Sequence, residues 1–269
     1  MAAIGLAGCG KMGGAMLRAW LDSGLVTHVH VLDPNGLPAD YISHPSVTYC
    51  ANEQTFVSFA SQWDWMVIAI KPQMMDDFCA AVKINLPANL GILSIAAGRT
   101  ISSLQRHFGS MQPIIRAMPN TPAAIRRGMT VAVSSPHVTE DARMQADSLL
   151  AALGKVEWIA DEGLMDAVTA VSGSGPAYVF YLIETMTVAG IRAGLEPDFA
   201  LTLARQTVLG SAALAEDMHD VLPGILRENV TSPNGTTAAA LSVLMDGRFQ
   251  ELMDHAIAAA AARSRELSQ

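Results

Sequence analysis

The chain has 269 residues, of which 51% are hydrophobic, with a mean hydropathy of +0.29 and a formal net charge of −8 at pH 7. This length allows a full core and two domains, at about 100–200 residues per domain. The acidic balance argues against nucleic-acid binding, and no run reaches the roughly 18 apolar residues that a membrane span requires, so we expect a small-molecule partner.

The first predicted elements are a strand at 3–7 and a helix at 11–23, joined by a glycine-rich turn. In this GxGxxG pattern, Gly8 permits the sharp turn, Gly10 lets the backbone approach a pyrophosphate, and Gly13 lets the helix pack against the strand. The helix N-terminus would then face the phosphates with free N–H groups. A glycine turn without a ligand is the alternative.

An acidic residue closes the second predicted strand, at 29–32. Asp33 stands 20 residues after Gly13, close to the spacing of about 20 residues at which such folds place the acid that binds a ribose hydroxyl. This spacing favours a dinucleotide site. On the same strand, His28 and His30 share a face, but no third ligand stands at a readable spacing. We therefore interpret both as strand-surface residues and predict no metal.

Up to residue 160, apolar β-type runs alternate with helical ones, which is the βαβ pattern of a parallel sheet. Further strands are predicted at 47–49, 65–70, 91–95, 114–118, 130–133 and 156–159. Helical periodicity is found at 75–82, 101–108 and 140–152.

From Glu162 onward the β-type runs stop. Pro176 and Pro197 suit first-turn positions and Gly194 suits a helix C-terminus. The predicted fold class is therefore α/β: an N-terminal Rossmann-type dinucleotide-binding domain (1–160), then an all-helical domain (161–269). Helices are predicted in the second domain at 164–171, 176–193, 197–217, 236–245 and 249–267.

The three cysteines, Cys9, Cys50 and Cys79, form no CxxC pair and are odd in number, which fits reduced thiols in a reducing compartment. We interpret Cys9 as a small buried residue. The N-terminal apolar stretch lacks a basic region, and Lys11 lies inside the glycine turn, so this stretch is expected to be a core strand. A cytoplasmic protein is the expectation.

In a chain of this organisation, the loops after the strands carry the chemistry, in a crevice between the domains. Motifs spread over nearly the whole chain resemble the Δ1-pyrroline-5-carboxylate reductase family. They read GCGKMG (8–13), AIKPQ (69–73), SIAAG (94–98), MPNTP (118–122), and the pair DAVTAVSGSGPAYVF (166–180) and LRENVTSPNGTTAAAL (226–241). The resemblance implies reduction of 1-pyrroline-5-carboxylate to L-proline by hydride from NADPH or NADH, the last step of proline biosynthesis.

The resemblance also implies a cofactor site and an intertwined homodimer or higher homo-oligomer, in which the helical domain's contribution comes from the partner subunit. Lys71 and Asn120 have plainer alternatives, as a solvated lysine and a turn asparagine. The implied cofactor residues are Gly8, Cys9, Gly10, Lys11, Met12 and Gly13 at the pyrophosphate, Asp33 and Asn52 at the adenosine, Ala69, Lys71, Pro72, Ala96 and Ala97 along the rest, Asn120 near the nicotinamide, and Asn229, which like the 232–237 loop comes from the helical domain.

The chain has no serine–histidine–aspartate order, no cysteine–histidine pair and no lysine within 172–184. A protonated cyclic imine is already electrophilic, so hydride transfer mainly needs positioning. We predict that Thr237 donates the proton or orients the imine, and that Ser232 with the amides of Gly235, Thr236 and Thr237 holds the substrate carboxylate. Asp220 is a weaker candidate, which would steady this loop. A merely capped helix is the alternative.

Three positions depart from the family pattern: Asn234 replaces glycine, Leu222 replaces histidine, and Lys11 replaces asparagine or glutamine. If position 234 requires a positive φ, this chain depends on the tolerance of asparagine.

Two rival functions remain open. A β-hydroxyacid dehydrogenase would carry a lysine at the start of the long helix, and 175–184 contains none. A dinucleotide-binding sensor would not need the hydroxyls at 232–237. Finally, the small apolar run at 256–262 predicts a subunit interface formed by the C-terminal helices.

Overall fold

The computed structural model describes residues 1–83 and 86–267. The chain divides into two compact units, one made of Met1–Gly173 with the chain from Ala260 onward, the other of Ser174–Ala259. The boundary predicted at residue 160 follows the end of the last strand, whereas the contacts that define the first unit continue to Gly173. A hydrogen bond from Ser264 Oγ to Asp166 Oδ1, 2.6 Å long, joins the end of the last helix to this unit.

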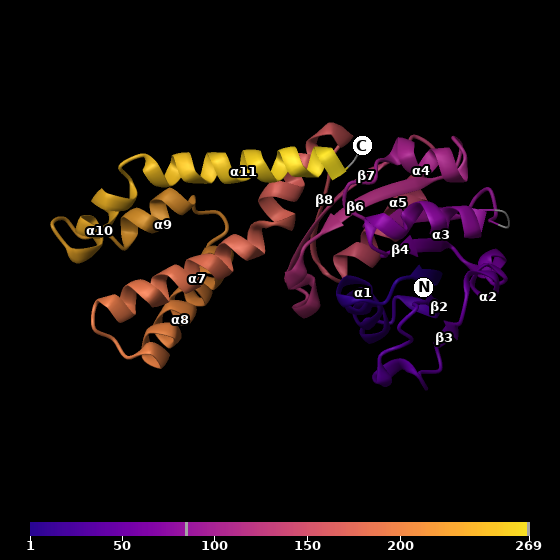
Figure 1. Ribbon diagram of the computed structural model, residues 1–269, viewed down its shortest axis with the longest axis horizontal. Coiled ribbons are helices and arrows are strands. Elements are labelled where there is room, and N and C mark those ends of the chain that lie inside the picture. Colours follow the sequence, from indigo (N-terminus) through magenta and orange to yellow (C-terminus); the bar gives the residue numbers. More distant parts are fainter. Residues whose placement is uncertain (84–85, 268–269) are drawn as a thin grey trace. The chain divides into compact units, whose positions relative to one another are not determined.

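The first unit is built on a single eight-stranded sheet in the order β3-β2-β1-β4-β5-β6-β7-β8 (Figure 1). All eight predicted strands are present, and most boundaries agree within a few residues. The strands are β1 (Ala2–Ala7), β2 (Val26–Leu32), β3 (Val47–Cys50), β4 (Trp65–Ile68), β5 (Gly91–Ser94), β6 (Ile114–Pro119), β7 (Gly128–Ser134) and β8 (Gly154–Trp158).

The expectation of a wholly parallel sheet is wrong at one edge. Strands β1 to β6 pair in parallel, but β7 runs antiparallel to β6, and β8 is parallel to β7. Only a short 3₁₀ turn, Thr121–Ile125, separates β6 from β7. A parallel connection needs a crossover of a dozen or more residues, so this short link reverses the chain direction.

Helices cover both faces of this sheet, because the strand side chains alternate between two apolar clusters. On one face, Ile4, Leu6 and Val67 pack with α1 and α5. On the other face, Met66 and Ile68 pack with α2, α3 and α4. The helices of this unit are α1 (Lys11–Asp22), α2 (Glu53–Val57), α3 (Met75–Val82), α4 (Ile101–Phe108), α5 (Glu140–Ala151) and α6 (Met165–Val168).

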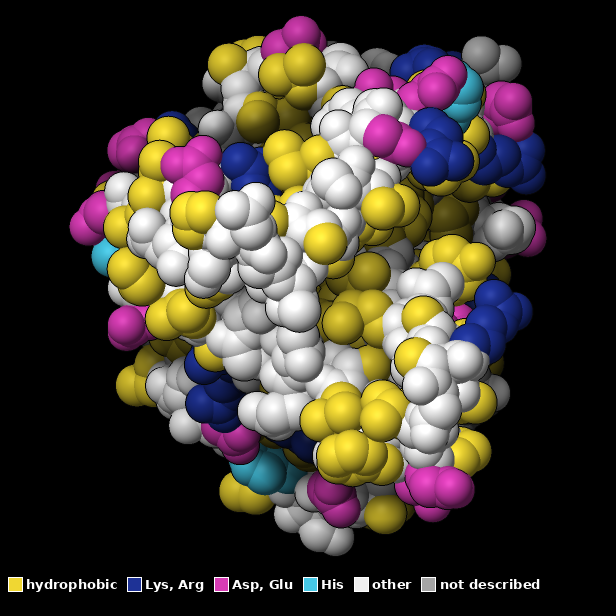
Figure 2. Space-filling view, turned by 90° about the vertical axis from the view of Figure 1, so that its left-hand side faces the viewer, with side chains coloured by type: hydrophobic (Ala, Val, Ile, Leu, Met, Phe, Trp, Pro, Cys, Tyr) yellow, Lys and Arg dark blue, Asp and Glu magenta, His cyan; other side chains and the backbone are white. Residues whose placement is uncertain are grey.

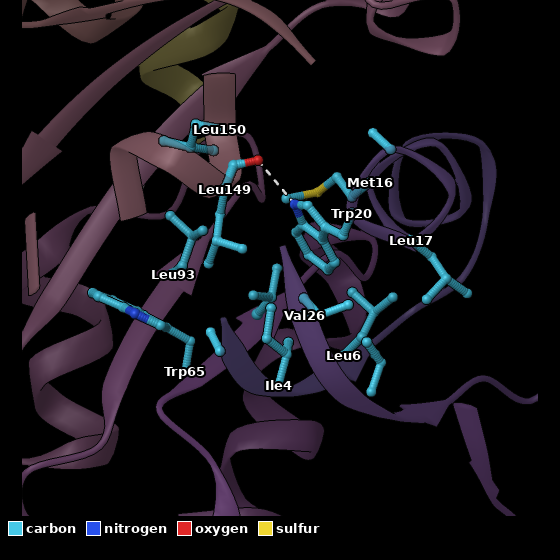
Figure 3. Packing of buried hydrophobic residues seen from close by; sticks show 14 of the residues in the cluster. Ile4, Leu6, Met16, Leu17, Trp20, Val26, Trp65, Leu93, Leu149 and Leu150 are labelled. Carbon is cyan, nitrogen blue, oxygen red and sulfur yellow. Dashed lines mark hydrogen bonds between the residues drawn. The ribbon is translucent and has the colours of Figure 1, made fainter. Parts of the chain in front are cut away.

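Trp20 joins two distant helices at the centre of the first cluster (Figure 3). Its indole is fully buried, and Nε1 donates a 2.8 Å hydrogen bond to the carbonyl oxygen of Leu149 on α5. This bond satisfies the one polar atom of the ring, so the whole side chain can be buried in this cluster beside Met16 and Leu149. Helix α1 is thereby anchored to α5.

The second unit is helical, as predicted, but it has little core of its own. No residue of α7 is buried, and in α8 only Ala200 and Ala204 are buried. Hydrophobic side chains reach the surface across the face shown in Figure 2. The helices of this second unit are α7 (Gly175–Arg192), α8 (Pro197–Asp217), α9 (Pro223–Asn229), α10 (Thr236–Leu244) and the first part of α11 (Arg248–Leu267).

The helix ends agree with their sequence signals. Pro176 and Pro197 lie in first turns, and Gly194 follows α7 with a φ of +102°. Two short helices, α2 and α9, were not predicted, because neither is long enough to show a helical period. The helix predicted at 164–171 is a composite, since α6 passes into a π turn at Thr169–Gly173.

The interpretation of His30 as a surface residue is wrong. Its imidazole is 4% exposed, stacks on Phe59 with ring centroids 4.1 Å apart, and accepts a 3.1 Å hydrogen bond at Nδ1 from Trp63 Nε1. Burial, with a smaller effect of neighbouring His28, lowers the pKa of His30 to about 4.

This burial predicts a loss of stability in acid. The unfolded state protonates its histidine near pH 6.5 while folded His30 resists protonation, so stability should fall as the pH drops from about 6.5 towards 4, by about 1–3 kcal/mol. His30→Asn, which keeps an acceptor oxygen near the Nδ1 position, should remove this pH dependence, and His255→Asn on the exposed α11 should not. Urea unfolding monitored by tryptophan fluorescence gives the free energy of unfolding at each pH. If this free energy fell equally between pH 6.5 and 4 in the parent and in both variants, the prediction would be contradicted.

Candidate active site

The predicted nucleotide residues lie along one edge of the sheet. They follow the carboxyl ends of five neighbouring strands, in the spatial order β2, β1, β4, β5, β6. The order of the strands reverses between β1 and β4, and ligands of doubly wound folds bind at such a switch point. In that spatial order, the edge carries Asp33, the turn at 8–13, Ala69 to Pro72, Ala96 and Ala97, and Asn120.

The glycine turn has the geometry that a phosphate site requires. Gly8 has a φ of +94°, and a Cβ there would come within 2.6 Å of the Ala69 carbonyl oxygen. A Cβ at Gly13 would collide with the carbonyl oxygen of Gly8, so α1 can pack this closely only with glycine. By contrast, a Cβ at Gly10 would meet no atom within 4 Å. The backbone at Gly10 is therefore open to a ligand.

The N-terminus of α1 is suited to an anion. Gly10 is the N-cap residue, without a side-chain cap, and no acidic residue lies in the first turn. The unpaired N–H groups and the helix dipole therefore remain available to a phosphate. Exposed Lys11 forms no ion pair with another residue in the described ranges, while Met12 is half-buried against the core.

Asp33 is held in place by the backbone around it. Its carboxylate accepts a 2.6 Å hydrogen bond from Cys9 N and a 2.8 Å hydrogen bond from Asn35 N, and the side chain is almost fully buried. Tyr49 Oη also donates to the Asp33 carbonyl oxygen. Two backbone donors stabilise the ionised carboxylate, so a fixed negative charge lies beside the glycine turn.

Cys9 is buried, as predicted. Burial, and then the charge of Asp33, raise the pKa of its thiol to about 11. The thiol therefore stays protonated and unreactive at neutral pH. Cys50 and Cys79 are also free and buried, with thiol pKa values raised by burial to about 11 and about 12.

The loop after β4 is braced by an arginine that sequence reasoning missed. Arg99 donates 2.8 Å to the Pro72 carbonyl oxygen and pairs with Asp76 at 2.7 Å. Lys71, in the same loop, is exposed and forms no ion pair with any described residue. Since Arg99 follows the β5 loop and Asp76 lies on α3, only the folded sheet brings them together.

The loop after β5 contacts the end of the chain. Ala96 is buried and Ala97 half-buried, while Gly98 has a φ of +72°. A Cβ at Gly98 would lie 2.6 Å from the Leu267 carbonyl oxygen. The end of α11 therefore packs against a predicted cofactor loop.

The Asn120 side chain already makes structural hydrogen bonds to both neighbouring segments. Its Oδ1 accepts from Met129 N at 2.8 Å, and its Nδ2 donates to the Ser172 carbonyl oxygen at 3.2 Å. The amide thus joins the β6–β7 turn to the π turn. Asn52 is likewise used locally, because its Oδ1 accepts from Thr55 N at 2.8 Å and caps α2. Contact of either residue with a cofactor stays a prediction.

The predicted substrate residues gather at the start of α10 in the second unit. Gly235 is the N-cap residue and no side chain caps the helix. Asn234 has a φ of +59°, so this position does require the left-handed conformation that asparagine tolerates. Gly235 N donates a 3.0 Å hydrogen bond to the Ser232 carbonyl oxygen, which closes the turn. The turn therefore presents the helix N-terminus to solvent.

Three hydroxyls surround this terminus and form no hydrogen bond to another described residue: those of Ser232, Thr236 and Thr237. Ser232 and Thr236 are exposed, and Thr237 is half-buried. With the helix amides they form a group of donors suited to a carboxylate and an imine nitrogen.

Two remaining candidates lie elsewhere in the second unit. Asn229 ends α9, and Asp220 is exposed and lies 3.4 Å from the Nε2 atom of His219. Asp220 makes no contact with the Ser232–Thr237 turn that would steady it, so its predicted supporting role gains no evidence. Leu222 is the N-cap residue of α9 and is 73% exposed.

Within residues 1–83 and 86–267, no group of three histidine, cysteine, aspartate or glutamate side chains is arranged to hold a metal ion. The same ranges contain no helix with the length and apolarity needed to cross a membrane. A Rossmann-type sheet with an open glycine turn, followed by a helical unit bearing a cluster of hydroxyls, defines a dinucleotide-dependent oxidoreductase.

Comparisons with known proteins give the family. Residues 162–267 match the family described as pyrroline-5-carboxylate reductase dimerisation, and residues 3–98 match the family described as NADP oxidoreductase coenzyme F420-dependent. The pyrroline-5-carboxylate reductase of Pseudomonas aeruginosa is 44% identical over 206 residues, covering 77% of this chain and 75% of that protein.

Two solved structures extend the likeness to the whole chain. The pyrroline-5-carboxylate reductase of Coxiella burnetii has a TM-score of 0.90 and 32% identity, and covers 100% of this chain and 99% of its own. The pyrroline carboxylate reductase of Plasmodium falciparum, solved with NADP bound, has a TM-score of 0.84 and 26% identity, covering 100% and 98%. The chain belongs to the pyrroline-5-carboxylate reductase family.

Proposed function

We propose that the chain reduces 1-pyrroline-5-carboxylate to L-proline in the cytoplasm, with NADPH or NADH as the reductant. The observation that carries this proposal is the pairing, in one chain of this family, of an open glycine turn with an uncapped helix start surrounded by hydroxyls. The first suits a dinucleotide, and the second suits a small anionic imine.

The residues along the sheet edge fit the cofactor. Gly8, Gly10 and Gly13 would hold the pyrophosphate against α1, and Asp33 would accept hydrogen bonds from the adenosine ribose. When bound, the reduced cofactor supplies a hydride. Lys71 and Lys11 add positive charge for its phosphates.

The start of α10 would bind and orient the substrate. The amides of Thr236 and Thr237, with the Ser232 hydroxyl, would hold the carboxylate. The Thr237 hydroxyl oxygen would accept a hydrogen bond from the protonated ring nitrogen and keep that proton in place. Because the protonated imine is already electrophilic at C5, positioning accounts for most of the catalysis, and no strong acid is needed.

The decisive assay mixes the protein with pyrroline-5-carboxylate and NADH or NADPH, and measures both cofactor oxidation and proline formation. A matched pair of variants tests the glycine turn. Gly10→Val should fold normally, because the position is open, but should block the phosphates and raise KM for the cofactor at least 10-fold. Gly210→Ala, at an open position on α8 where an added Cβ meets no atom within 4 Å, should not. If neither cofactor is oxidised, the proposal is wrong.

We also propose that the active form is a homodimer or larger, assembled through the helical unit. Exposed apolar side chains on α7, α8, α10 and α11 support this, since a monomer rarely leaves so many in contact with water. The 256–262 run contributes only in part, because Ala261 is already buried. We expect light scattering to give at least twice the chain mass of 28.4 kDa; a stable, active monomer at assay concentration would contradict this.

A further inference from the structure

One arginine ties together two loops that would line the same cofactor. The loop after β4 (residues 69–72) and the loop after β5 (residues 96–98) follow neighbouring parallel strands, and a 3.0 Å bond from Ile95 N to the Ile68 carbonyl oxygen continues the pairing to the start of these loops. Past this point, the Arg99 side chain reaches from the end of the β5 loop to the β4 side. A side chain that joins both loops can set their separation.

The guanidinium of Arg99 uses its forked shape on two neighbours at once. Nη1 donates to Asp76 Oδ1 at 2.7 Å, while Nη2 donates to Asp76 Oδ2 at 3.2 Å and to the Pro72 carbonyl oxygen at 2.8 Å. Two bonds to one carboxylate are the strongest form of such a pair, and they fix the plane of the guanidinium. A single contact between exposed charges would contribute little, but this geometry restrains both partners.

The Pro72 carbonyl is the point where Arg99 acts on the β4 loop. Pro72 opens the 3₁₀ turn Pro72–Met74, and its carbonyl oxygen also accepts from Met75 N at the start of α3. Lys71 is the N-cap residue of this turn and has an extended backbone, with φ −65° and ψ 143°. Holding the turn in place therefore also holds Lys71, the exposed cation proposed to face the cofactor phosphates.

Both partners in this brace are themselves fixed. Asp76 lies in the first turn of α3, and His107 Nε2 on α4 lies 3.2 Å from its Oδ1 atom. The hydrogen bond from Arg99 is the main cause that holds the pKa of Asp76 below its usual value, so the carboxylate is charged at neutral pH. Arg99 itself follows Gly98, whose φ of +72° and close contact with Leu267 define the path of the loop.

We propose that Arg99 is a positioning residue for the cofactor: through its bonds to Pro72 and Asp76 it holds the β4 and β5 loops at the separation that a bound dinucleotide needs. This role rests on the proposed function and adds to it a side chain that would touch neither the cofactor nor the substrate. The effect should fall on cofactor binding, because loops that are not held in advance must be ordered when the cofactor binds.

Direct measurement of dinucleotide binding tests this role without any turnover. In calorimetric titrations of the full-length protein with NADH and with NADPH, Arg99→Met should raise Kd about 5- to 20-fold, because methionine keeps the length of the side chain and removes its donors. Arg126→Met is the matched control. It removes the same charge from another exposed ion pair, with Asp22 at the end of α1 away from the glycine turn, and should leave Kd within about 2-fold of the parent.

The variant Asp76→Asn separates bracing from direct contact with the cofactor. If Arg99 acts through the brace, this change should also weaken binding, by about 3- to 10-fold, although it removes a negative charge that repels the cofactor. If Arg99 instead bound a cofactor phosphate, its release from Asp76 would leave Kd unchanged or lower it, which would overturn the proposal. The double variant should bind within about 2-fold of Arg99→Met, since both changes break one interaction. Fully additive losses would also overturn it.

Thermal melting distinguishes positioning from a merely structural role. If Arg99→Met melted at a lower temperature but bound both dinucleotides with the Kd of the parent, the proposal would be wrong. With saturating cofactor, its kcat for the imine should stay within about 2-fold of the parent. A parent protein that binds the dinucleotides but reduces no imine would overturn the proposed function alone, because the comparison of Kd values would still hold. A parent that binds neither dinucleotide would overturn both.

Discussion

Replacing Thr237 by alanine is expected to lower kcat/KM for the imine by roughly 10- to 1,000-fold, the range for losing one positioned hydrogen bond in the transition state. The effect is bounded because the protonated imine supplies most of its own activation. Cofactor affinity should change little, since the Thr237 hydroxyl is proposed to contact the substrate ring and the glycine turn is proposed to hold the cofactor phosphates. Steady-state kinetics with each substrate varied in turn separate the two effects.

The controls distinguish the hydroxyl from the packing of the methyl group. Thr237→Ser keeps the hydroxyl and should keep most of the activity. Ser242→Ala removes another hydroxyl from α10, one that bonds at 2.7 Å to the Ala239 carbonyl oxygen, and should leave the kinetics unchanged. If Thr237→Ala turned over normally while Thr237→Ser did not, the hydroxyl would have no role in catalysis, and Thr237 would act through the packing of its methyl group.

The sheet edge was readable from the sequence because its signals are local. Apolar runs of three to six residues predict the strands, and GxGxxG requires particular backbone geometry at Gly8 and Gly13, which the positive φ of Gly8 and the close contacts at both glycines confirm. The condition stated for Asn234 was equally local: its φ is +59°, so this chain does depend on the tolerance of asparagine for the left-handed conformation.

Features that depend on distant partners were not readable. His30 looked like a surface residue because strand alternation does not reveal what packs on a face, and Phe59 and Trp63 come from a segment with no clear period. Likewise, Arg99 finds Asp76 and the Pro72 carbonyl only after β4 and β5 pair. The reversal of β7 did have a signal, because the link after β6 is too short for a crossover.

Cofactor choice should favour NADH, by an expected factor of about 10 in kcat/KM, which corresponds to roughly 1.4 kcal/mol. The Asp33 carboxylate is fixed beside the glycine turn by Cys9 N and Asn35 N, so it cannot easily turn away from a ligand. It can accept hydrogen bonds from a ribose hydroxyl but repels a 2′-phosphate, and residues 33–40 contain no arginine or lysine to offset that charge. Lys11 is the one nearby cation in the turn that opposes this preference.

Removing the charge should shift the preference. Asp33→Asn should reduce the ratio of kcat/KM for NADH to that for NADPH by about 10-fold, because the repulsion disappears while an acceptor oxygen remains. Since an amide group would then face one backbone N–H, a melting curve must show that the variant is folded. Asp141→Asn makes the same change of charge in the first turn of α5 and should leave the ratio unchanged. Parent kinetics that already favour NADPH would show that Lys11 outweighs Asp33, and Lys11→Gln should then restore the preference for NADH.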